Sequence, residues 1–247
     1  MSQHLSRAKA GKNWPIKRKA TKWITGVAPG PHPIASAINL NILLKEYLKY
    51  ASTSRECRKI LNQKIILVDK KPRTNPRFPI GIMDVIEIQK TKQRYRLILD
   101  ENGKFRLINI SPKNSSLKPF KIINKTTLPG KKTQLNLSNG KNILSENQEL
   151  KVNDTLILDL TNNKIHKHLK FAKNSQLYLM AGKNAGAYGT LKDEYKENML
   201  KPRILVDTGK EKIETLKEYA LVIEKDFIEQ GKNEDGKHED GTNNEAD

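Results

Sequence analysis

Lysine and arginine side chains, interleaved with two tryptophans, are the groups near the N-terminus of this chain that could do chemistry. Residues 1–41 contain seven Lys and Arg and no Asp or Glu. Ammonium and guanidinium groups neutralise phosphates, and indole rings stack on bases, so this composition is typical of a segment that contacts nucleic acid. Trp14 and Trp23 could instead pin the segment onto the core of the next domain. The candidate phosphate contacts in this segment are Arg7, Lys12, Lys17, Arg18, Lys19 and Lys22.

A second group of cations lies farther along the chain. Arg55, Arg58 and Lys59 are three and four residues apart, so on a helix they share one side. The only acidic residue near them is Glu56. Such a run usually forms a charged face in contact with solvent, but this spacing favours a groove that binds phosphates. The candidate contacts in this group are Arg55, Arg58, Lys59, Lys64, Lys70, Lys71, Arg73 and Arg77.

Residues suited to catalysis or metal binding are sparse. Cys57 is the only cysteine, which excludes an internal disulfide and a thiolate cluster for zinc or iron–sulfur. His166 and His168 would share one face of a strand, but a metal site needs a third ligand and only Asp159 is close in sequence. Paired carboxylates for acid–base work are scarce where the chain is basic. We therefore predict no catalytic residue, no metal site, no cofactor and no small-molecule substrate.

The charge of the whole chain favours a polyanion as partner. The 247 residues contain 46 Lys and Arg against 27 Asp and Glu, a net charge of +19, and residues 191–247 are net acidic. Nucleic acid is the default partner, because an anionic membrane would require a basic amphipathic helix that residues 1–41 lack. No window approaches the ~18 uncharged apolar residues of a membrane span, and no signal peptide is visible. We predict a soluble, cytoplasmic protein with no membrane partner.

Two short helices and a small sheet are the elements that must position the second group of cations. Apolar residues recur at helical spacing over 40–48, and Thr53-Ser-Arg-Glu56 is a helix start with a carboxylate three residues on. Strands are expected at 64–68 and 83–88, on either side of the basic turn region 72–77. This order resembles the small α-L RNA-binding module, in which the second helix and the following loop form one positive groove for structured RNA. The residues that match are Ser54-Arg-Glu56, Val68-Asp69 and Pro79-Ile-Gly-Ile-Met-Asp-Val85.

Short apolar runs alternate with turns beyond residue 92. The hairpin signal at 93–110 opens a series of strands that predicts a small β-domain. At 177–189 a strand, a glycine-rich turn and another strand suit a small twisted barrel, and the spacing fits neither a dinucleotide nor a P-loop fingerprint. This stretch resembles the KOW motif, whose turn touches RNA, so Lys183 and Asn184 are candidate contacts.

The order of these modules is more specific than any one of them. A basic segment with Pro29-Gly-Pro-His32 precedes the α-L module, and Val152-Asn-Asp154 precedes the KOW glycines 182, 186 and 189. Together they resemble the archaeal and eukaryotic small-subunit ribosomal protein family called protein four-e, and the length is closer to the archaeal form. Alanine stands at 181 and 187, where the family usually places glycine and arginine, which leaves Lys183 as the cation of the turn.

The resemblance implies a non-enzymatic structural constituent of the small ribosomal subunit, which supports translation and contacts small-subunit ribosomal RNA and neighbouring ribosomal proteins. An extra-ribosomal RNA-binding regulator or an RNA-modification accessory protein stays open as the alternative. An RNA-modifying enzyme, such as a pseudouridine synthase, needs a larger catalytic domain than the short strands after residue 92 provide.

We expect an α+β multi-domain fold. Its parts are a basic N-terminal arm (1–41), the α-L module of two helices and a small sheet (42–92), a central β-domain (93–172), a KOW-type domain (173–230), and a disordered acidic C-terminal tail (231–247). Both β-domains are expected to be small and barrel-like.

Overall fold

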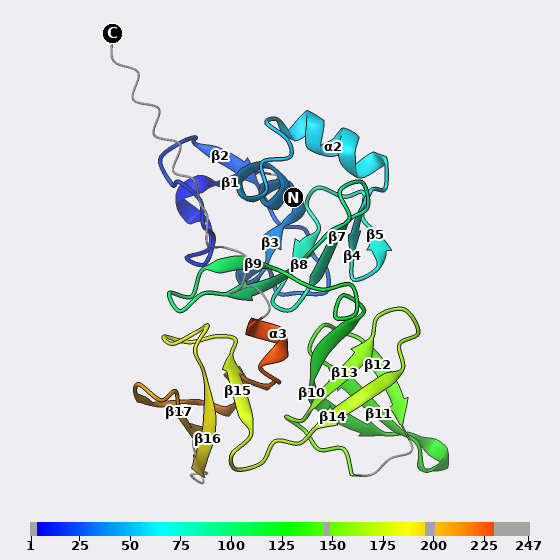
Figure 1. The fold of residues 1–247 in the computed structure, drawn as a ribbon, viewed down its shortest axis with the longest axis vertical. Coiled ribbons are helices and arrows are strands. Elements are labelled where there is room, and N and C mark those ends of the chain that lie inside the picture. Colours follow the sequence, from blue (N-terminus) through cyan, green and yellow to red (C-terminus); the bar gives the residue numbers. More distant parts are fainter. Residues whose placement is uncertain (1–3, 146–148, 196–200, 230–247) are drawn as a thin grey trace.

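The structure, a computed structural model, describes residues 4–145, 149–195 and 201–229 and is mostly β. Figure 1 shows an upper lobe built from the N-terminal half and two lower lobes built from the strands that follow. The predicted tail 231–247 lies outside the described residues. In the described ranges no helix has the length and apolar character to cross a membrane.

The N-terminal arm is folded onto the upper lobe. Strand β1 (His4–Ser6) pairs antiparallel with β2 (Trp23–Thr25), and a 3-10 turn follows β1 at Arg7–Lys9. A second 3-10 turn (Ile34–Ser36) leads to β3 (Ile38–Asn39). The partner of β3 is β6 (Pro79–Ile80), so the arm ends inside the next domain.

Two helices follow β3, as the sequence predicts. The first begins as α1 (Leu40–Ile42) and continues as a π-helical segment (Leu43–Tyr47). The second, α2 (Ser54–Asn62), starts with a capping box in which Thr53 Oγ1 accepts a hydrogen bond from the Glu56 N–H. The Glu56 carboxylate accepts from the Thr53 N–H in return, which satisfies two backbone donors at the helix start. The predicted start of the second helix is therefore confirmed.

Five strands form the sheet of the upper lobe. Their spatial order is β5 (Lys71–Pro72), β4 (Ile66–Val68), β7 (Val85–Ile88), β8 (Gln93–Leu99) and β9 (Phe105–Asn109). The 93–110 hairpin thus extends the sheet that follows α2, whereas the sequence analysis assigns it to the central β-domain. All four residues of β7 are buried and β7 pairs along both edges, so the hairpin supplies its second partner.

The central lobe is an antiparallel sheet around a long strand, β10 (Leu117–Thr127). A 3-10 turn (Pro129–Lys131) follows β10, and a bulge between Ile122 and Asn124 shifts its register against β11. The other strands of this sheet, which runs in the order β12-β11-β10-β13-β14, are β11 (Thr133–Leu137), β12 (Asn142–Ser145), β13 (Thr155–Asp159) and β14 (Ile165–Leu169).

The C-terminal lobe is a second five-stranded sheet, in the order β18-β17-β16-β15-β19. Its strands are β15 (Gln176–Leu179), β16 (Tyr188–Tyr195), β17 (Arg203–Asp207), β18 (Lys212–Leu216) and β19 (Ala220–Val222). A 3-10 turn (Lys217–Tyr219) joins the last two strands, and α3 (Asp226–Glu229) follows them. In Figure 1, α3 lies between the lobes.

Strand β10 connects the central lobe to both other lobes. Lys118 and Lys121 are three residues apart, so their side chains leave opposite faces of the strand. The Lys118 ammonium reaches Asp69 in the upper lobe at 2.5 Å. The Lys121 ammonium donates to the carbonyl oxygens of Glu218 at 2.9 Å and Ala220 at 2.7 Å in the C-terminal lobe.

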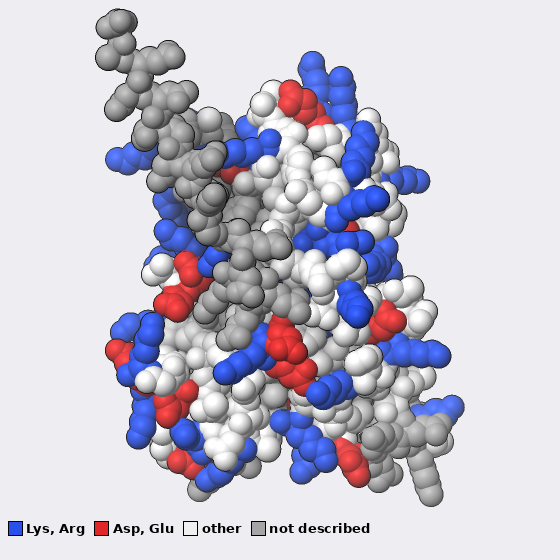
Figure 2. All heavy atoms as spheres, in the orientation of Figure 1, with Lys and Arg blue, Asp and Glu red and all other residues white. Residues whose placement is uncertain are grey.

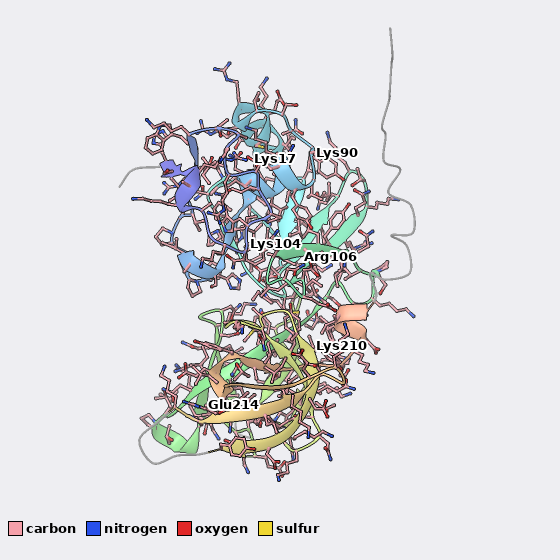
Figure 3. All side chains as sticks on the ribbon, turned by 90° about the vertical axis from the view of Figure 1, so that its left-hand side faces the viewer. Lys17, Lys90, Lys104, Arg106, Lys210 and Glu214 are labelled. Carbon is pink, nitrogen blue, oxygen red and sulfur yellow. The ribbon has the colours of Figure 1, made fainter. Side chains whose placement is uncertain are left out.

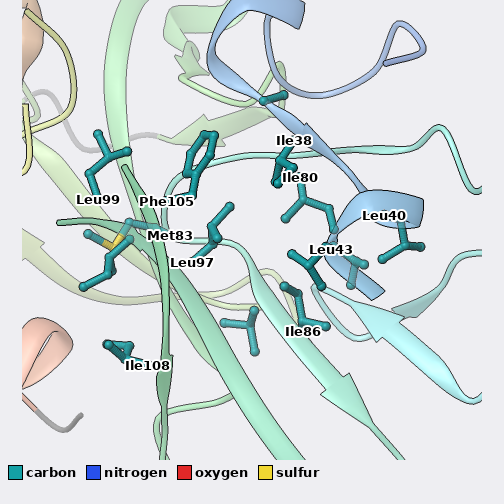
Figure 4. Close-up of a cluster of buried hydrophobic side chains, with 14 of the residues drawn as sticks. Ile38, Leu40, Leu43, Ile80, Met83, Ile86, Leu97, Leu99, Phe105 and Ile108 are labelled. Carbon is teal, nitrogen blue, oxygen red and sulfur yellow. The ribbon is translucent and has the colours of Figure 1, made fainter. Parts of the chain in front are cut away.

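Apolar side chains from the two helices, the arm and the sheet share one core in the upper lobe. Leu43 from the π-helical segment, Ile38 and Ile80 from the two-stranded sheet, and Leu97 and Phe105 from the hairpin are all buried (Figure 4). This packing fixes α2 and the arm relative to the sheet. The cations carried by these elements are therefore held on a rigid support.

Candidate nucleic-acid interface

The outer face of α2 carries exposed cations. Arg55, Arg58 and Lys59 are exposed, while Cys57 and Leu61 on the opposite side of the helix are buried. The three- and four-residue spacing predicted this division, because it places residues on one side of a helix. Lys64 and Lys71, in the segment after the helix, are exposed as well. Figure 2 shows Lys and Arg side chains around the top of the molecule, where α2 lies.

The arm and the α2 region enclose a cleft of about 590 Å³. Its lining includes Arg58 of α2 and Arg77 of the loop that follows, together with His4 of β1 and Trp23 of β2. The Trp23 side chain is 56 % exposed, and the Lys22 ammonium lies 5.6 Å from its ring centre. An exposed indole beside cations is the combination that binds bases next to phosphates.

The two tryptophans have different roles. Trp14 is only 4 % exposed, and its Nε1–H donates a hydrogen bond of 2.9 Å to the Ala37 carbonyl oxygen. It pins the arm onto the core, whereas Trp23 faces solvent at the cleft. Each of the two functions considered from the sequence therefore fits one of these residues.

Arg7, a predicted phosphate contact, points into the protein instead. It is 4 % exposed, and its Nη1–H and Nη2–H donate to the Glu46 carboxylate at 2.9 and 2.5 Å. This bidentate pair joins the arm to the π-helical segment. A phosphate could reach Arg7 only by breaking the pair, so we correct the sequence prediction and leave Arg7 out of the interface.

The other predicted cations of the arm are exposed. The Arg18 guanidinium also donates to the Ala8 carbonyl oxygen at 3.0 Å, which fixes part of the loop. The exposed arm cations are Lys12, Lys17, Arg18, Lys19 and Lys22.

Three predicted cations of the loops after α2 are partly engaged within the protein. The Lys70 ammonium pairs with Glu87 at 2.5 Å and donates to the Ser115 hydroxyl at 3.1 Å. The Arg73 guanidinium lies 4.3 Å from the ring centre of Phe78. The Arg77 Nε–H donates to the Gly26 carbonyl oxygen at 3.4 Å. Each of these side chains is only half-buried.

Exposed cations that the sequence analysis did not single out lie on the hairpin side of the upper lobe. Lys90, Lys104 and Arg106 are exposed, and Figure 3 shows Lys104 and Arg106 between Lys17 in the upper lobe and Lys210 in the C-terminal lobe, with Lys90 at the level of Lys17. They come from the turn before β8, the turn before β9 and β9 itself. Sequence reasoning missed Lys104 and Arg106 because it placed the hairpin in the central β-domain, and it gave Lys90, inside the predicted α-L module, no role.

The predicted KOW turn packs against the upper lobe. Gly186 has φ of 92°, and a Cβ built there would lie 2.0 Å from the Asp100 carbonyl oxygen in the β8–β9 turn. Only glycine fits so close an approach. Lys183 is exposed and Asn184 half-buried, and both line a cavity of about 520 Å³ that the two turns share. The structure thus gives this glycine a contact within the chain.

A buried ionic cluster joins three parts of the chain. The His32 Nε2 of the arm lies 2.8 Å from Asp84 Oδ1, and the Lys118 ammonium pairs with the same carboxylate and with Asp69. Asp84 Oδ2 accepts from the Gly81 N–H at 2.9 Å. The motif residues from 29–32, 68–69 and 79–85 therefore meet at one buried carboxylate, where they hold the fold together.

The charges of this cluster stabilise one another. Burial alone would raise the pKa of Asp84, but Lys118 and His32 outweigh it and hold that pKa well below its usual range. Burial likewise opposes the charge of Lys118, yet Asp69 and Asp84 bring its pKa above the usual value. Asp84 and Lys118 are therefore both charged at neutral pH.

Asp154 has a comparable structural role in the central lobe. Its Oδ2 lies 2.7 Å from His168 Nε2 and accepts from the Lys151 N–H at 3.0 Å, while Oδ1 accepts from the Phe171 N–H at 2.9 Å. The Val152-Asn-Asp154 motif thus orders the turn before β13. Over the described ranges, no group of three His, Cys, Asp or Glu could hold a metal ion.

The comparisons with known proteins assign the parts in chain order. Residues 1–35 match the RS4NT (NUC023) domain, residues 40–86 the S4 domain and residues 91–165 the Ribosomal family S4e. Both helices of the upper lobe and the candidate cations from Arg55 to Arg77 therefore lie in the part that matches the S4 domain.

Relatives match over almost the whole chain. The small ribosomal subunit protein eS4 of Methanothermobacter thermautotrophicus is 39 % identical over 226 residues, 91 % of this chain and 93 % of that protein. The protein of the same name from Archaeoglobus fulgidus is 36 % identical over 223 residues, 90 % of this chain and 93 % of its own. The crystal structure of the 30S ribosomal protein S4e from Thermoplasma acidophilum superposes with a TM-score of 0.67 at 26 % identity, covering 76 % of this chain and 95 % of that one. The chain belongs to the S4e family of ribosomal proteins.

Proposed function

We propose that this protein is a structural constituent of the small ribosomal subunit in the cytoplasm, where it binds ribosomal RNA, contacts neighbouring ribosomal proteins and supports translation. The observation that carries the proposal is the 39 % identity, over nine-tenths of the chain, to a protein named small ribosomal subunit protein eS4. The protein makes and breaks no bond and uses no cofactor.

The proposed mechanism is an electrostatic clamp. Lys45, Arg58 and Arg77 line the cleft between α2 and the arm, and the Lys22 ammonium of the arm lies 5.6 Å from the ring centre of Trp23, which also lines it. RNA entering the cleft therefore meets positive charge from both parts. Each neutralised phosphate releases condensed counterions, which favours binding without reading the sequence. The packed core keeps the cations in place, so the clamp recognises the shape of folded RNA.

The finer division of the chain belongs to this proposal. The arm and the α-L module hold RNA, while the central β-domain and the KOW-type, barrel-like domain contact adjacent RNA or protein surfaces. The five-stranded sheets of the two lower lobes support this division by giving each its own unit.

Replacing the cations of α2 tests the clamp. We expect the triple variant Arg55→Gln, Arg58→Gln, Lys59→Gln to bind small-subunit ribosomal RNA more weakly, because it loses up to three phosphate contacts. The slope of log affinity against log salt should fall by roughly 2 to 3 units, at about 0.7 to 0.9 per contact. Filter binding at several salt concentrations measures it.

The matched control replaces three exposed lysines of the other lobes: Lys132→Gln, Lys164→Gln and Lys212→Gln. It removes the same charge, so its slope should change by less than one unit if the contacts lie at α2. Equal slopes in the two triple variants would remove α2 from the interface.

A high-salt wash separates the proposed role from that of a regulator. A subunit component stays with the small subunit through the wash, whereas a regulator is stripped from it.

A further inference from the structure

The cleft between the arm and α2 has a polar floor with an unused hydrogen-bonding group. Asn41 lines the cleft and is only 3 % exposed. Its Nδ2 donates to the Thr25 hydroxyl at 2.7 Å and to the Ser54 hydroxyl at 3.1 Å. Its Oδ1 has no hydrogen-bond partner in the described part of the chain. A buried amide oxygen without a partner is costly, so the site is suited to a ligand that donates to it.

The wall of the cleft offers a stacking surface. Trp23 lies on the paired strand β2, and its side chain is 56 % exposed. Its ring meets the His4 ring edge-on, with an interplanar angle of 66° and 6.4 Å between the ring centres. Ile24 and Ile42 add apolar surface to the same cleft. A flat aromatic group can therefore enter beside the indole and exclude water.

The charges around the cleft favour an anion attached to that aromatic group. Lys45, Arg58 and Arg77 line it, and the acid that also lines it, Glu46, is paired with Arg7. The volume of about 590 Å³ falls within the roughly 300 to 1,000 Å³ of small-ligand pockets. A nucleotide has the three required features: a planar base, hydrogen-bonding groups on the base edge and a phosphate.

We propose that this cleft binds one unstacked nucleotide of the RNA, with the base beside Trp23, an amino group of its edge donating to Asn41 Oδ1, and its phosphates at Arg58 and Arg77. The inference rests on the proposed function and adds a specific base contact to the clamp. Single-stranded or bulged RNA supplies such a base, whereas a regular duplex keeps its bases stacked.

Two hexanucleotides of equal backbone charge test the proposal on the full chain. One carries six adenines, and the other is the same ribose–phosphate backbone without bases. Trp14 is buried and Trp23 is exposed, so added ligand should change the tryptophan fluorescence through Trp23. We expect the adenine hexamer to quench the emission and bind more tightly, and the abasic hexamer to leave the emission unchanged.

Matched variants of Trp23 separate stacking from charge. Trp23→Leu should weaken binding of the adenine hexamer by roughly 5- to 150-fold, the range for one lost stacked base, and leave the abasic hexamer unaffected. Trp23→Phe retains an aromatic ring and should keep most of the affinity. Asn41→Leu, with folding checked by circular dichroism, should weaken binding of the adenine hexamer and leave binding of the abasic hexamer unchanged. If Asn41→Leu does not fold, the comparison of Trp23→Leu with Trp23→Phe tests the proposal.

Equal affinity of the wild type for both hexamers, or a Trp23→Leu variant that binds like the wild type, overturns the proposal. The clamp itself survives that result if binding of small-subunit ribosomal RNA keeps its dependence on the α2 cations. Quenching by small-subunit proteins in the absence of RNA would also overturn it, because the cleft would then take a protein segment. Loss of all affinity for ribosomal RNA in the wild type would instead refute the proposed function.

Discussion

Single residues of this protein divide into those that face the solvent and those that hold the arm, and spacing alone separates only some of them. Arg55 and Lys59 could be placed on the outer face because a capped helix fixes their direction. Trp14 and Arg7 could not be placed, because their burial depends on partners distant in sequence, Ala37 and Glu46. Arginine and tryptophan occur in both groups, so residue type alone does not separate them.

Replacing the buried Lys118 should strongly destabilise the protein. Lys118→Met removes the cation between two carboxylates, and leaving a buried charge without its partner costs about 3 to 5 kcal/mol. Chemical denaturation should therefore show a large loss in the free energy of unfolding. The exposed control Lys164→Met should change it by less than about 0.5 kcal/mol. Adding Asp84→Asn to Lys118→Met should recover part of the loss, and simple additivity of the two changes would show that the residues are not coupled.

Acid should weaken the same cluster. The folded-state pKa of Asp84 lies below its value in the unfolded chain, so the unfolded chain binds more protons at low pH. The stabilisation is complete above the unfolded pKa of about 4 and is lost as the pH falls toward the folded value. Unfolding followed by circular dichroism should show a steep loss of stability below about pH 4. A flatter profile is expected for Asp84→Asn, and identical profiles would contradict the assignment.

At the scale of elements, features encoded by neighbouring residues were easier to predict than the pairing of strands distant in sequence. The capping box that starts α2 is encoded within four residues, so the sequence contained all of it. The partner of the 93–110 hairpin is not local, because any hairpin edge can pair with several strands. The buried cluster at Asp84 likewise needed the fold, since His32 and Lys118 lie on opposite sides of Asp84 in sequence and far from it.

The turn between β15 and β16 should tolerate no side chain at its second glycine. Gly186→Ala places a Cβ against the Asp100 carbonyl oxygen, so the two turns must separate. Gly140→Ala is the matched control, because that residue also has a positive φ, 76°, but nothing lies within 4 Å of its Cβ position. We expect Gly186→Ala to lose about 1 to 3 kcal/mol more than the control in the free energy of unfolding. Hydrogen exchange in the β8–β9 turn should rise in Gly186→Ala only; equal effects would exclude the contact.

At the scale of the whole molecule, the charge is divided between a basic body and an acidic end. Residues 231–247 contain two Lys and six Asp and Glu. Deleting them raises the net charge by four, and a more positive chain is drawn to RNA more strongly. Affinity for small-subunit ribosomal RNA should stay unchanged or rise slightly in a filter-binding measurement. A large loss of affinity would mean that the tail itself contacts RNA.

The buried cluster of His32, Asp84 and Lys118 also sets an order of events during synthesis. The arm leaves the translating ribosome first, but the complete cluster exists only after Lys118 has been added, 86 residues after His32. At the usual elongation rates this delay is roughly 4 to 17 s. During that interval the nascent arm carries its cations without the complete cluster, so chaperones or RNA can bind it before the upper lobe is fully assembled.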